Sequence, residues 1–349
     1  MKQRAMKNSV SVIVPNFNRV DQLKCCLHSI LHQSHSVLEV IIIDDFSEEW
    51  VYNKILKVVE EFRGEGLNIV VDRNFRNLGA NFSRNRGIDL AQGDFIAFID
   101  SDDAWLPQKL EIQLKAIEDR SNKTSSFILS ATGRYRVDEN GSIVCIQSSL
   151  KKLSLNSILS SNFIGSLSSV LVHREALLAV GGFDEQLGAG QDWDLYIRLC
   201  EKVDFVNVPD PLLIYVDHQG QRITLNSRKR LQSHLRIYAR HIRPYGVREL
   251  DIHKIYEIFA EDYQGLGNKN RTEHFLALSL ANSFPFRVLG KLLYYPIRIW
   301  LCCFGAQDIR MKRYERYAKL LRRQKYKDIQ YFNETQYKIM KILNSDSRM

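Results

Sequence analysis

Three carboxylates fall within four residues at Asp100-Ser101-Asp102-Asp103. The segment before them, residues 94–100, is apolar between its two aspartates and is predicted to form a buried strand. Adjacent carboxylates repel one another and are costly to desolvate, so a fold that packs them beside an apolar strand needs a counter-charge. A divalent metal carrying a diphosphate would supply it. The alternative is a solvated acidic turn before a helix that begins at Pro107, but a helix cap needs one carboxylate rather than three.

The first hundred residues predict the elements that position this cluster. Short β-rich apolar runs occur at 9–14, 40–43, 68–71 and 94–100, and apolar residues recur at helical spacing between them. Asn18 is expected to cap the first of these helices. Alternating strands and helices predict an α/β fold with a mostly parallel central sheet flanked by helices. Ligands of such sheets bind at the carboxyl ends of the strands, where the acidic cluster is expected to lie.

The absence of two phosphate-binding motifs narrows the class of ligand that the chain can bind. The turn after the first strand is Pro15-Asn16-Phe17-Asn18, without the glycines that let a backbone approach a dinucleotide pyrophosphate, and no Gly-Lys-Ser/Thr phosphate loop occurs in the chain. Phosphates that glycine amides do not bind need a metal to neutralise them. Oxygen-only ligands favour Mg²⁺ or Mn²⁺ over zinc.

Six segments stand out along the chain: Ser11–Asn18, Val40–Asp45, Asn77–Gly87, Phe98–Leu110, Gly181–Asp184 and Asp192–Leu195. In this order they resemble the family 2 glycosyltransferases of bacterial surface-polysaccharide synthesis, which have the GT-A fold. The resemblance implies a GT-A catalytic domain over residues 1–225, with a nucleotide-sugar half at about 9–105 and an acceptor half at about 106–225. A helical, basic C-terminal region at 226–349 is expected to follow as an appendage.

The resemblance also implies donor-side roles. Pro15 and Phe17 would frame the base and ribose, Asp45 would accept a hydrogen bond from the base, and Asp102 would bind the metal that bridges the phosphates. The full implied nucleotide-sugar set is Pro15, Phe17, Asn18, Asp45, Asn77, Gly79, Arg84, Asp100, Ser101 and Asp103. From the residues alone, the aspartates after the second strand could equally be strand-end caps, and Arg84 could be a helix-surface arginine.

On the acceptor side, Gly188-Ala-Gly190 precedes a helix predicted at 191–199, and Asp192 at its start could be an N-cap. The resemblance implies instead that Asp192 is the general base, which deprotonates an acceptor hydroxyl for direct attack on the anomeric carbon. Gln191, where the family usually has Glu, and Trp193 would face the acceptor. His218 would join Asp102 at the metal, although a lone histidine is as often a surface residue.

Composition and charge indicate the cellular location of the protein and its contact with membranes. Six cysteines in unpatterned positions predict neither a disulfide framework nor a zinc site, and the N-terminus does not read as a cleaved signal peptide, so a cytoplasmic enzyme is expected. Residues 284–328 hold twelve Lys or Arg against three acids, a surplus equal to the net charge of +9 for the whole chain. We expect this basic, aromatic segment to hold the enzyme at the inner face of an anionic membrane, with packing on the catalytic domain as the alternative.

These observations together predict an inverting, metal-dependent hexosyl- or N-acetylhexosaminyltransferase. It would move a sugar from a UDP-linked donor to a hydroxyl of a glycan or lipid-linked glycan acceptor. A sugar-nucleotide nucleotidyltransferase is the second candidate, but residues 15–19 lack its glycine-rich loop. A basic nucleic-acid-binding protein is the third, and it leaves the acidic cluster unexplained. No nucleic acid partner is therefore expected.

Overall fold

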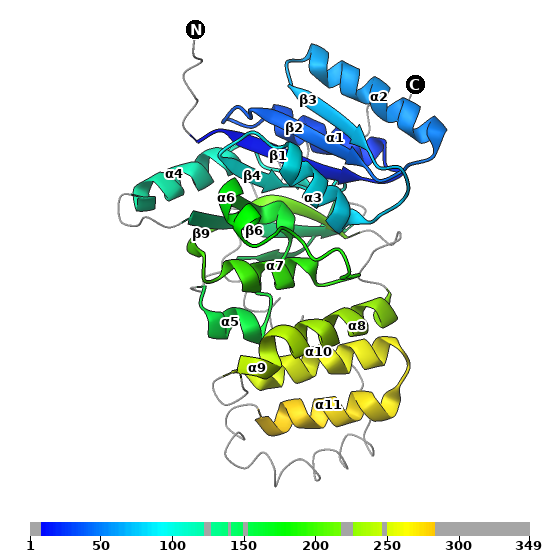
Figure 1. Cartoon of the computed structure of the whole chain (residues 1–349), viewed down its shortest axis with the longest axis vertical. Coiled ribbons are helices and arrows are strands. Elements are labelled where there is room, and N and C mark those ends of the chain that lie inside the picture. Colours follow the sequence, from blue (N-terminus) through cyan, green and yellow to red (C-terminus); the bar gives the residue numbers. More distant parts are fainter. Residues whose placement is uncertain are drawn as a thin grey trace.

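A nine-stranded mixed sheet forms the centre of the protein (Figure 1). The computed structural model describes residues 8–121, 127–138, 141–148, 153–217, 226–245 and 250–282. The strand order is β3-β2-β1-β4-β8-β6-β9-β5, with β7 paired to β6. The strands are β1 Val10–Asn16, β2 Glu39–Asp44, β3 Ile69–Arg73, β4 Phe95–Phe98, β5 Ala104–Trp105, β6 Phe127–Asp138, β7 Ile143–Gln147, β8 Val170–His173 and β9 Val203–Asp217.

Helices cover both faces of the sheet, and a group of C-terminal helices extends from one of them (Figure 1). The helices are α1 Asp21–Leu31, α2 Glu49–Gly64, α3 Ala80–Leu90, α4 Lys109–Ser121, α5 Leu155–Ser160, α6 Arg174–Ala179, α7 Gln191–Leu199, α8 Ser227–Ile237, α9 Arg243–Tyr245, α10 Ile252–Gly265 and α11 Lys269–Asn282. Short 3₁₀ and π-helical turns occupy Leu167–Ser169 and Tyr238–Ile242.

The first half of the sheet is parallel, as the alternating pattern predicts. β1 pairs in parallel with β2 and β4, and β2 pairs in parallel with β3. Alternate residues of β1 enter opposite cores: Val12 and Val14 pack with α1 and α2, whereas Ile13 packs with α3 and the second half of the chain. Because parallel strands end at one edge, the loops after β1, β2, β3 and β4 meet there.

The second half adds antiparallel strands. β8 pairs antiparallel with both β4 and β6, and the long strands β6 and β9 run parallel to each other. This arrangement confirms the α/β class with flanking helices. Two local predictions differ from the structure. β1 continues through Pro15 to Asn16, and the Asn18 side chain does not cap α1 but accepts a hydrogen bond from the Glu48 amide at 2.9 Å.

The C-terminal helices α8 to α11, here called the appendage, share a core with the preceding residues. One buried cluster includes Trp193 and Leu195 of α7 together with Ile237 of α8 and Phe259 of α10. In the part of the chain that the structure describes, no helix is long and apolar enough to cross a membrane. The predicted membrane segment at 284–328 and His218 lie outside the described residues.

Candidate active site

The acidic cluster lies directly after β4, at the edge where the parallel strands end. Asp103 is buried, one of its carboxylate oxygens has no hydrogen-bond partner, and burial together with Asp102 and Asp100 raises its pKa well above the usual range. Ser168 holds the loop, because its hydroxyl accepts a hydrogen bond from the Asp100 amide at 3.0 Å and donates one to the Asp103 carboxylate. The Ser101 hydroxyl is also buried without a partner. Such a site can accept a cation and polar ligand groups.

Two arginines supply counter-charge to this cluster. Arg84 on α3 is 3% exposed, and its Nη2 donates a 2.6 Å hydrogen bond to Asp100. Its Nε and Nη1 atoms are buried and have no partner, so two donors remain available. Arg19, in the loop after β1, forms a 2.9 Å ion pair with Asp102. Arg84 is therefore a buried guanidinium in the candidate site rather than a helix-surface arginine.

Asp192 occupies the first turn of α7, beyond a sharp bend in the chain. Gly190 precedes the helix with φ +66°, a left-handed conformation that favours glycine. The Asp192 carboxylate accepts hydrogen bonds from the Asn162 side chain at 2.9 Å and from the Trp193 amide at 2.8 Å. Burial raises the pKa of Asp192, while Asn162 and the charge of Arg84 act in the opposite direction. The influence of Arg84 places Asp192 near the acidic cluster, more than 80 residues away in sequence.

The sequence prediction missed Arg134 of β6. Burial lowers the pKa of this arginine, and the negative charge of Asp103 opposes that shift. Its guanidinium packs against Gly165, where an added Cβ would lie 2.0 Å from Nη1. The signal available in the sequence is an arginine that directly follows Gly133 within a β-rich run.

The residues after β1 and β2 form the other part of this edge. Asp45 is buried, and its carboxylate accepts hydrogen bonds of 2.8 Å from the Leu78 amide, the Gly79 amide and the Asn74 side chain. Asp45 thus fixes the start of α3 and keeps little acceptor capacity for a base. Phe17 is 43% exposed at the same edge.

Two further predicted residues lie at this edge, together with one that was not predicted. Pro15 is paired in the sheet with Ile43, and Asn77 is exposed in the loop before α3. Asn16, between Pro15 and Phe17, has a buried amide with no partner and was not predicted.

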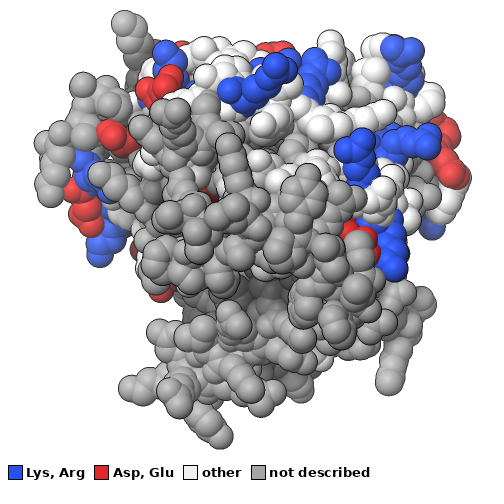
Figure 2. All heavy atoms as spheres, turned by 90° about the horizontal axis from the view of Figure 1, so that it is seen from below, with Lys and Arg blue, Asp and Glu red and all other residues white. Residues whose placement is uncertain are grey.

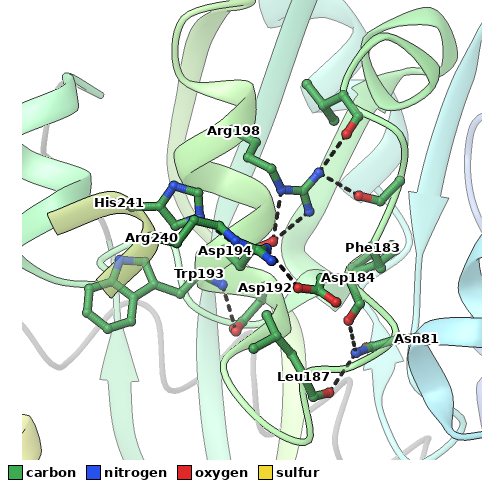
Figure 3. A network of polar contacts seen from close by, with 12 residues as sticks. Asn81, Phe183, Asp184, Leu187, Asp192, Trp193, Asp194, Arg198, Arg240 and His241 are labelled. Atoms are coloured by element: carbon green, nitrogen blue, oxygen red, sulfur yellow. Dashed lines mark hydrogen bonds and ion pairs between the residues drawn. The ribbon is translucent and has the colours of Figure 1, made fainter. Parts of the chain in front are cut away.

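A hydrogen-bonded network fixes the loop that leads to Asp192 (Figure 3). Arg198 donates to Asp194 through Nε and Nη2, at 2.9 and 2.7 Å, and through Nη1 to the carbonyl oxygens of Val180 and Gly182. Asn81 on α3 donates to two carbonyl oxygens of the same loop. The loop is therefore tied to both α7 and α3.

The appendage reaches the same network. Arg240 forms a 2.8 Å ion pair with Asp184, and His241 Nε2 lies 2.8 Å from Asp194, which is 1% exposed (Figure 3). Trp193 is also buried, and its indole N–H donates to the Ile158 carbonyl at 2.6 Å. Trp193 therefore packs in the core, and its role on the acceptor side stays a prediction.

The residues at the acidic cluster fit a divalent cation. Within the described residues, no group of three or more His, Cys, Asp or Glu side chains forms a complete metal site. Mg²⁺ and Mn²⁺ sites of nucleotide enzymes commonly take one or two carboxylates and complete the shell with phosphate oxygens and water. Asp102, with a buried partnerless oxygen on Asp103 beside it, matches that donor set.

The fold and these residues define a glycosyltransferase of the GT-A type, and comparison with known proteins gives the family. The family model "Glycosyl transferase family 2" matches residues 11–177. An uncharacterized glycosyltransferase of Haemophilus influenzae is 32% identical over 211 residues, which cover 60% of this chain and 68% of that protein. The amylovoran biosynthesis glycosyltransferase AmsB of Erwinia amylovora is 31% identical over 215 residues, or 59% and 69% of the two chains. The chain belongs to glycosyltransferase family 2.

Further similarities concern a named activity and the fold. Escherichia coli WfgD, a UDP-Glc:alpha-D-GlcNAc-diphosphoundecaprenol beta-1,3-glucosyltransferase, is 32% identical over 162 residues, 46% of this chain and 59% of WfgD. The structure of Staphylococcus aureus TarS 1–349 with UDP-GlcNAc has a TM-score of 0.54 at 16% identity, covering 86% of this chain and 93% of that one. The mannosyltransferase PcManGT of Pyrobaculum calidifontis with GDP-Man and Mn²⁺ has a TM-score of 0.50 at 16% identity, covering 84% and 86%.

Proposed function

We propose that this family 2 glycosyltransferase transfers a hexosyl or N-acetylhexosaminyl group from a UDP-sugar to a hydroxyl of a lipid-linked glycan, with inversion at the anomeric carbon. The observation that carries the proposal is the position of Asp192. Its carboxylate is held by Asn162 and lies within the electrostatic influence of Arg84, which itself binds Asp100 of the acidic cluster.

The proposed reaction is a single displacement. Asp192 takes the proton of the acceptor hydroxyl as its oxygen attacks the anomeric carbon, and the bond to the nucleoside diphosphate breaks. A raised pKa makes Asp192 a stronger base than an exposed aspartate, because burial disfavours its charged form. Arg84 offers two free donors to an anionic ligand at the acidic cluster.

Asp102 is the proposed ligand of Mg²⁺ or Mn²⁺ in the bound state. The cation would neutralise the departing diphosphate. Binding there requires the ion pair between Arg19 and Asp102 to open, which frees Arg19 for the phosphates. His218 remains a proposed second ligand.

The donor and acceptor classes follow from the relatives. WfgD, by its description, uses UDP-Glc and an acceptor linked to diphosphoundecaprenol, and AmsB is described as an amylovoran biosynthesis enzyme. We infer a UDP-sugar and a lipid-linked glycan for this chain as well. We further propose that it acts at the cytoplasmic face of the membrane.

A transfer assay with a panel of UDP-sugars and synthetic lipid diphosphate acceptors tests the proposal. Asp192→Asn preserves the shape of the side chain but removes the proton acceptor, so kcat should fall by about 10²–10⁴-fold while the Kd for the UDP-sugar stays nearly constant. Asp89→Asn, an exposed position on α3, is the matched control and should retain full activity. Loss of UDP-sugar binding with an unchanged kcat would show that Asp192 has a structural role.

A further inference from the structure

The first helices of the appendage form a strongly basic strip. Residues 227–245, which span α8, the π-helical turn and α9, contain six Lys or Arg and no Asp or Glu. The six are Arg228, Lys229, Arg230, Arg236, Arg240 and Arg243. This surplus is separate from the basic segment at 284–328.

Five of the exposed residues of this strip share one face. Arg228, Gln232, Leu235, Ala239 and Arg243 are exposed and recur at spacings of three or four, so they follow one side of the helix. The opposite side is buried in the core through residues such as Leu231, Ile237 and Ile242. Leu235 and the nearby Tyr245 remain 42% and 43% exposed among these charges. The exposed face is therefore both basic and partly apolar.

Within the part of the chain that the structure describes, three of the six charges are not compensated by an ion pair. Arg230 pairs with Asp262 at 2.5 Å, and Arg236 and Arg240 both approach Asp184, at 3.6 and 2.8 Å. Arg228, Lys229 and Arg243 form no ion pair with any residue that the structure describes. Figure 2, seen from the appendage end, shows Lys and Arg side chains at several places on this side of the molecule, with Asp and Glu side chains beside some of them.

The strip adjoins the loop that leads to the proposed base. The Ser233 hydroxyl accepts a hydrogen bond from the Ala189 amide at 3.1 Å. An added Cβ on Gly188 would lie 3.4 Å from Lys229, and one on Gly190 would lie 3.1 Å from Ile237. Residues 188–190 are followed at once by Gln191 and Asp192, so whatever binds the strip lies close to the acceptor side of the site.

We propose that this strip, residues 227–245, docks the enzyme on an anionic membrane surface and so brings a lipid-embedded acceptor to the acceptor side. The proposal rests on the proposed function for its acceptor, although the membrane binding can be measured without it. Uncompensated Lys and Arg with exposed Leu and Tyr suit the interface of an anionic bilayer. A nucleic acid partner is less favoured, because stacking of bases needs aromatic residues interleaved with the charges, and this face presents Tyr245 as its one exposed aromatic residue among those described.

The test uses the full chain and the triple variant Arg228→Gln, Lys229→Gln, Arg243→Gln in vesicle co-sedimentation. Vesicles of phosphatidylcholine alone are compared with vesicles that also contain phosphatidylglycerol. Each cation near an anionic surface contributes about fivefold to binding, so the triple variant should lose on the order of 100-fold in its partition coefficient for anionic vesicles. The matched control is Lys57→Gln, Lys115→Gln, Arg120→Gln, which removes three exposed charges from α2 and α4. Residues 284–328 are unchanged in every variant, so the ratio of the wild-type and variant partition coefficients reports on the strip alone.

Retained vesicle binding by the triple variant, an equal loss in the control, or no preference of the wild-type chain for anionic vesicles would overturn the proposal. Displacement of the wild-type chain from vesicles by single-stranded RNA at lower concentration than by free phosphatidylglycerol would assign the strip to nucleic acid instead. UDP-sugar hydrolysis without acceptor should be the same in the wild-type chain and the triple variant, since none of the three residues belongs to the donor site. Absence of UDP-sugar hydrolysis by the wild-type chain would count against the proposed function. The vesicle measurement would still test membrane binding, because it does not depend on hydrolysis.

Discussion

At the level of single residues, the rate of the proposed transfer depends on how the protein sets the basicity of Asp192. Burial raises its pKa, and the hydrogen bond from Asn162 lowers it because that bond favours the charged form. A base acts only when it is deprotonated, so the rate falls as the pH drops through its pKa. The raised pKa predicts that the acid limb of kcat/KM lies above the range of an exposed aspartate.

Removal of the Asn162 side chain tests, through the pH dependence of the rate, whether Asp192 is the general base. Asn162→Ala deletes a donor to the charged carboxylate, so the pKa of Asp192 should rise further and the acid limb should shift to higher pH. The measurement is the pH profile of kcat/KM for sugar transfer, with Asn53→Ala on the exposed side of α2 as control. An acid limb that stays in place, or moves to lower pH, would contradict the assignment.

A second prediction concerns the metal. Asp102→Asn removes a proposed ligand that is not a core contact, so transfer should be abolished and Mn²⁺-dependent binding of UDP should weaken, while the melting temperature changes little. Isothermal titration of UDP with and without Mn²⁺ measures the effect, and Asp89→Asn is again the control. Substantial turnover of the variant at saturating Mn²⁺ would exclude Asp102 as a ligand.

The sequence predicted many of these residues but not their contacts. The acidic cluster, Arg84 and Asp192 could be found because their types and order match a family pattern. The burial of Trp193 and the pairing of Asp102 with Arg19 depend on how distant elements pack, which residue order does not show. Arg134 was missed for the same reason, since its neighbours at the site come from other strands and helices.

At the scale of elements, the position of α7 depends on Arg198 and Asp194. Asp194 is 1% exposed and its pKa is lowered, because hydrogen bonds from His241 and Arg198 outweigh the effect of burial. The charged Asp194 carboxylate therefore stabilises the folded protein at pH values above the pKa of Asp194 in the unfolded chain. This stabilisation is lost as the pH falls through the pKa of Asp194 in the folded protein. The same arginine holds the carbonyl oxygens of Val180 and Gly182. The base helix and the preceding loop are thus fixed by one side chain.

Arg198→Met should therefore destabilise the protein strongly. It removes two hydrogen bonds to the buried Asp194 carboxylate, which keeps His241 as a partner, and two more to the carbonyl oxygens of Val180 and Gly182, at a cost of about 3–5 kcal/mol in the free energy of unfolding. Urea unfolding measures the change, with Arg120→Met at an exposed position of α4 as control, for which about 0.5 kcal/mol or less is expected. A loss for Arg198→Met no larger than that of the control would show that the network does not fix the helix.

Element positions were predicted well where apolar periodicity is strong. The helix at 191–199 has the predicted bounds, with Leu195 and Leu199 buried. The antiparallel pairing of β8 with β4 and β6 was not predicted, because strand partners far apart in sequence leave no local pattern. The prediction that Asn18 caps a helix was wrong for a related reason. Its side chain accepts a hydrogen bond from the amide of Glu48, which lies in another loop.

At the scale of the whole molecule, the catalytic half and the appendage form one packed body. We predicted a boundary near residue 225, and that division of roles remains a proposal. Yet the buried cluster that holds Trp193 continues into α8 and α10, and Arg240 and His241 bind Asp184 and Asp194 across the boundary. The appendage therefore supports α7 and the loop before it directly, and a surface on α8 is held in a fixed relation to Asp192.

The central claim is a single displacement with Asp192 as the base, and the anomeric configuration of the product tests it most directly. The wild-type enzyme is given an α-linked UDP-sugar with a lipid diphosphate acceptor, and the new glycosidic linkage is read from its proton coupling constant by NMR. Direct attack of the acceptor hydroxyl inverts the anomeric carbon, so the account predicts a β-linked product. An α-linked product would require two displacements or attack from the same face, and would contradict the account.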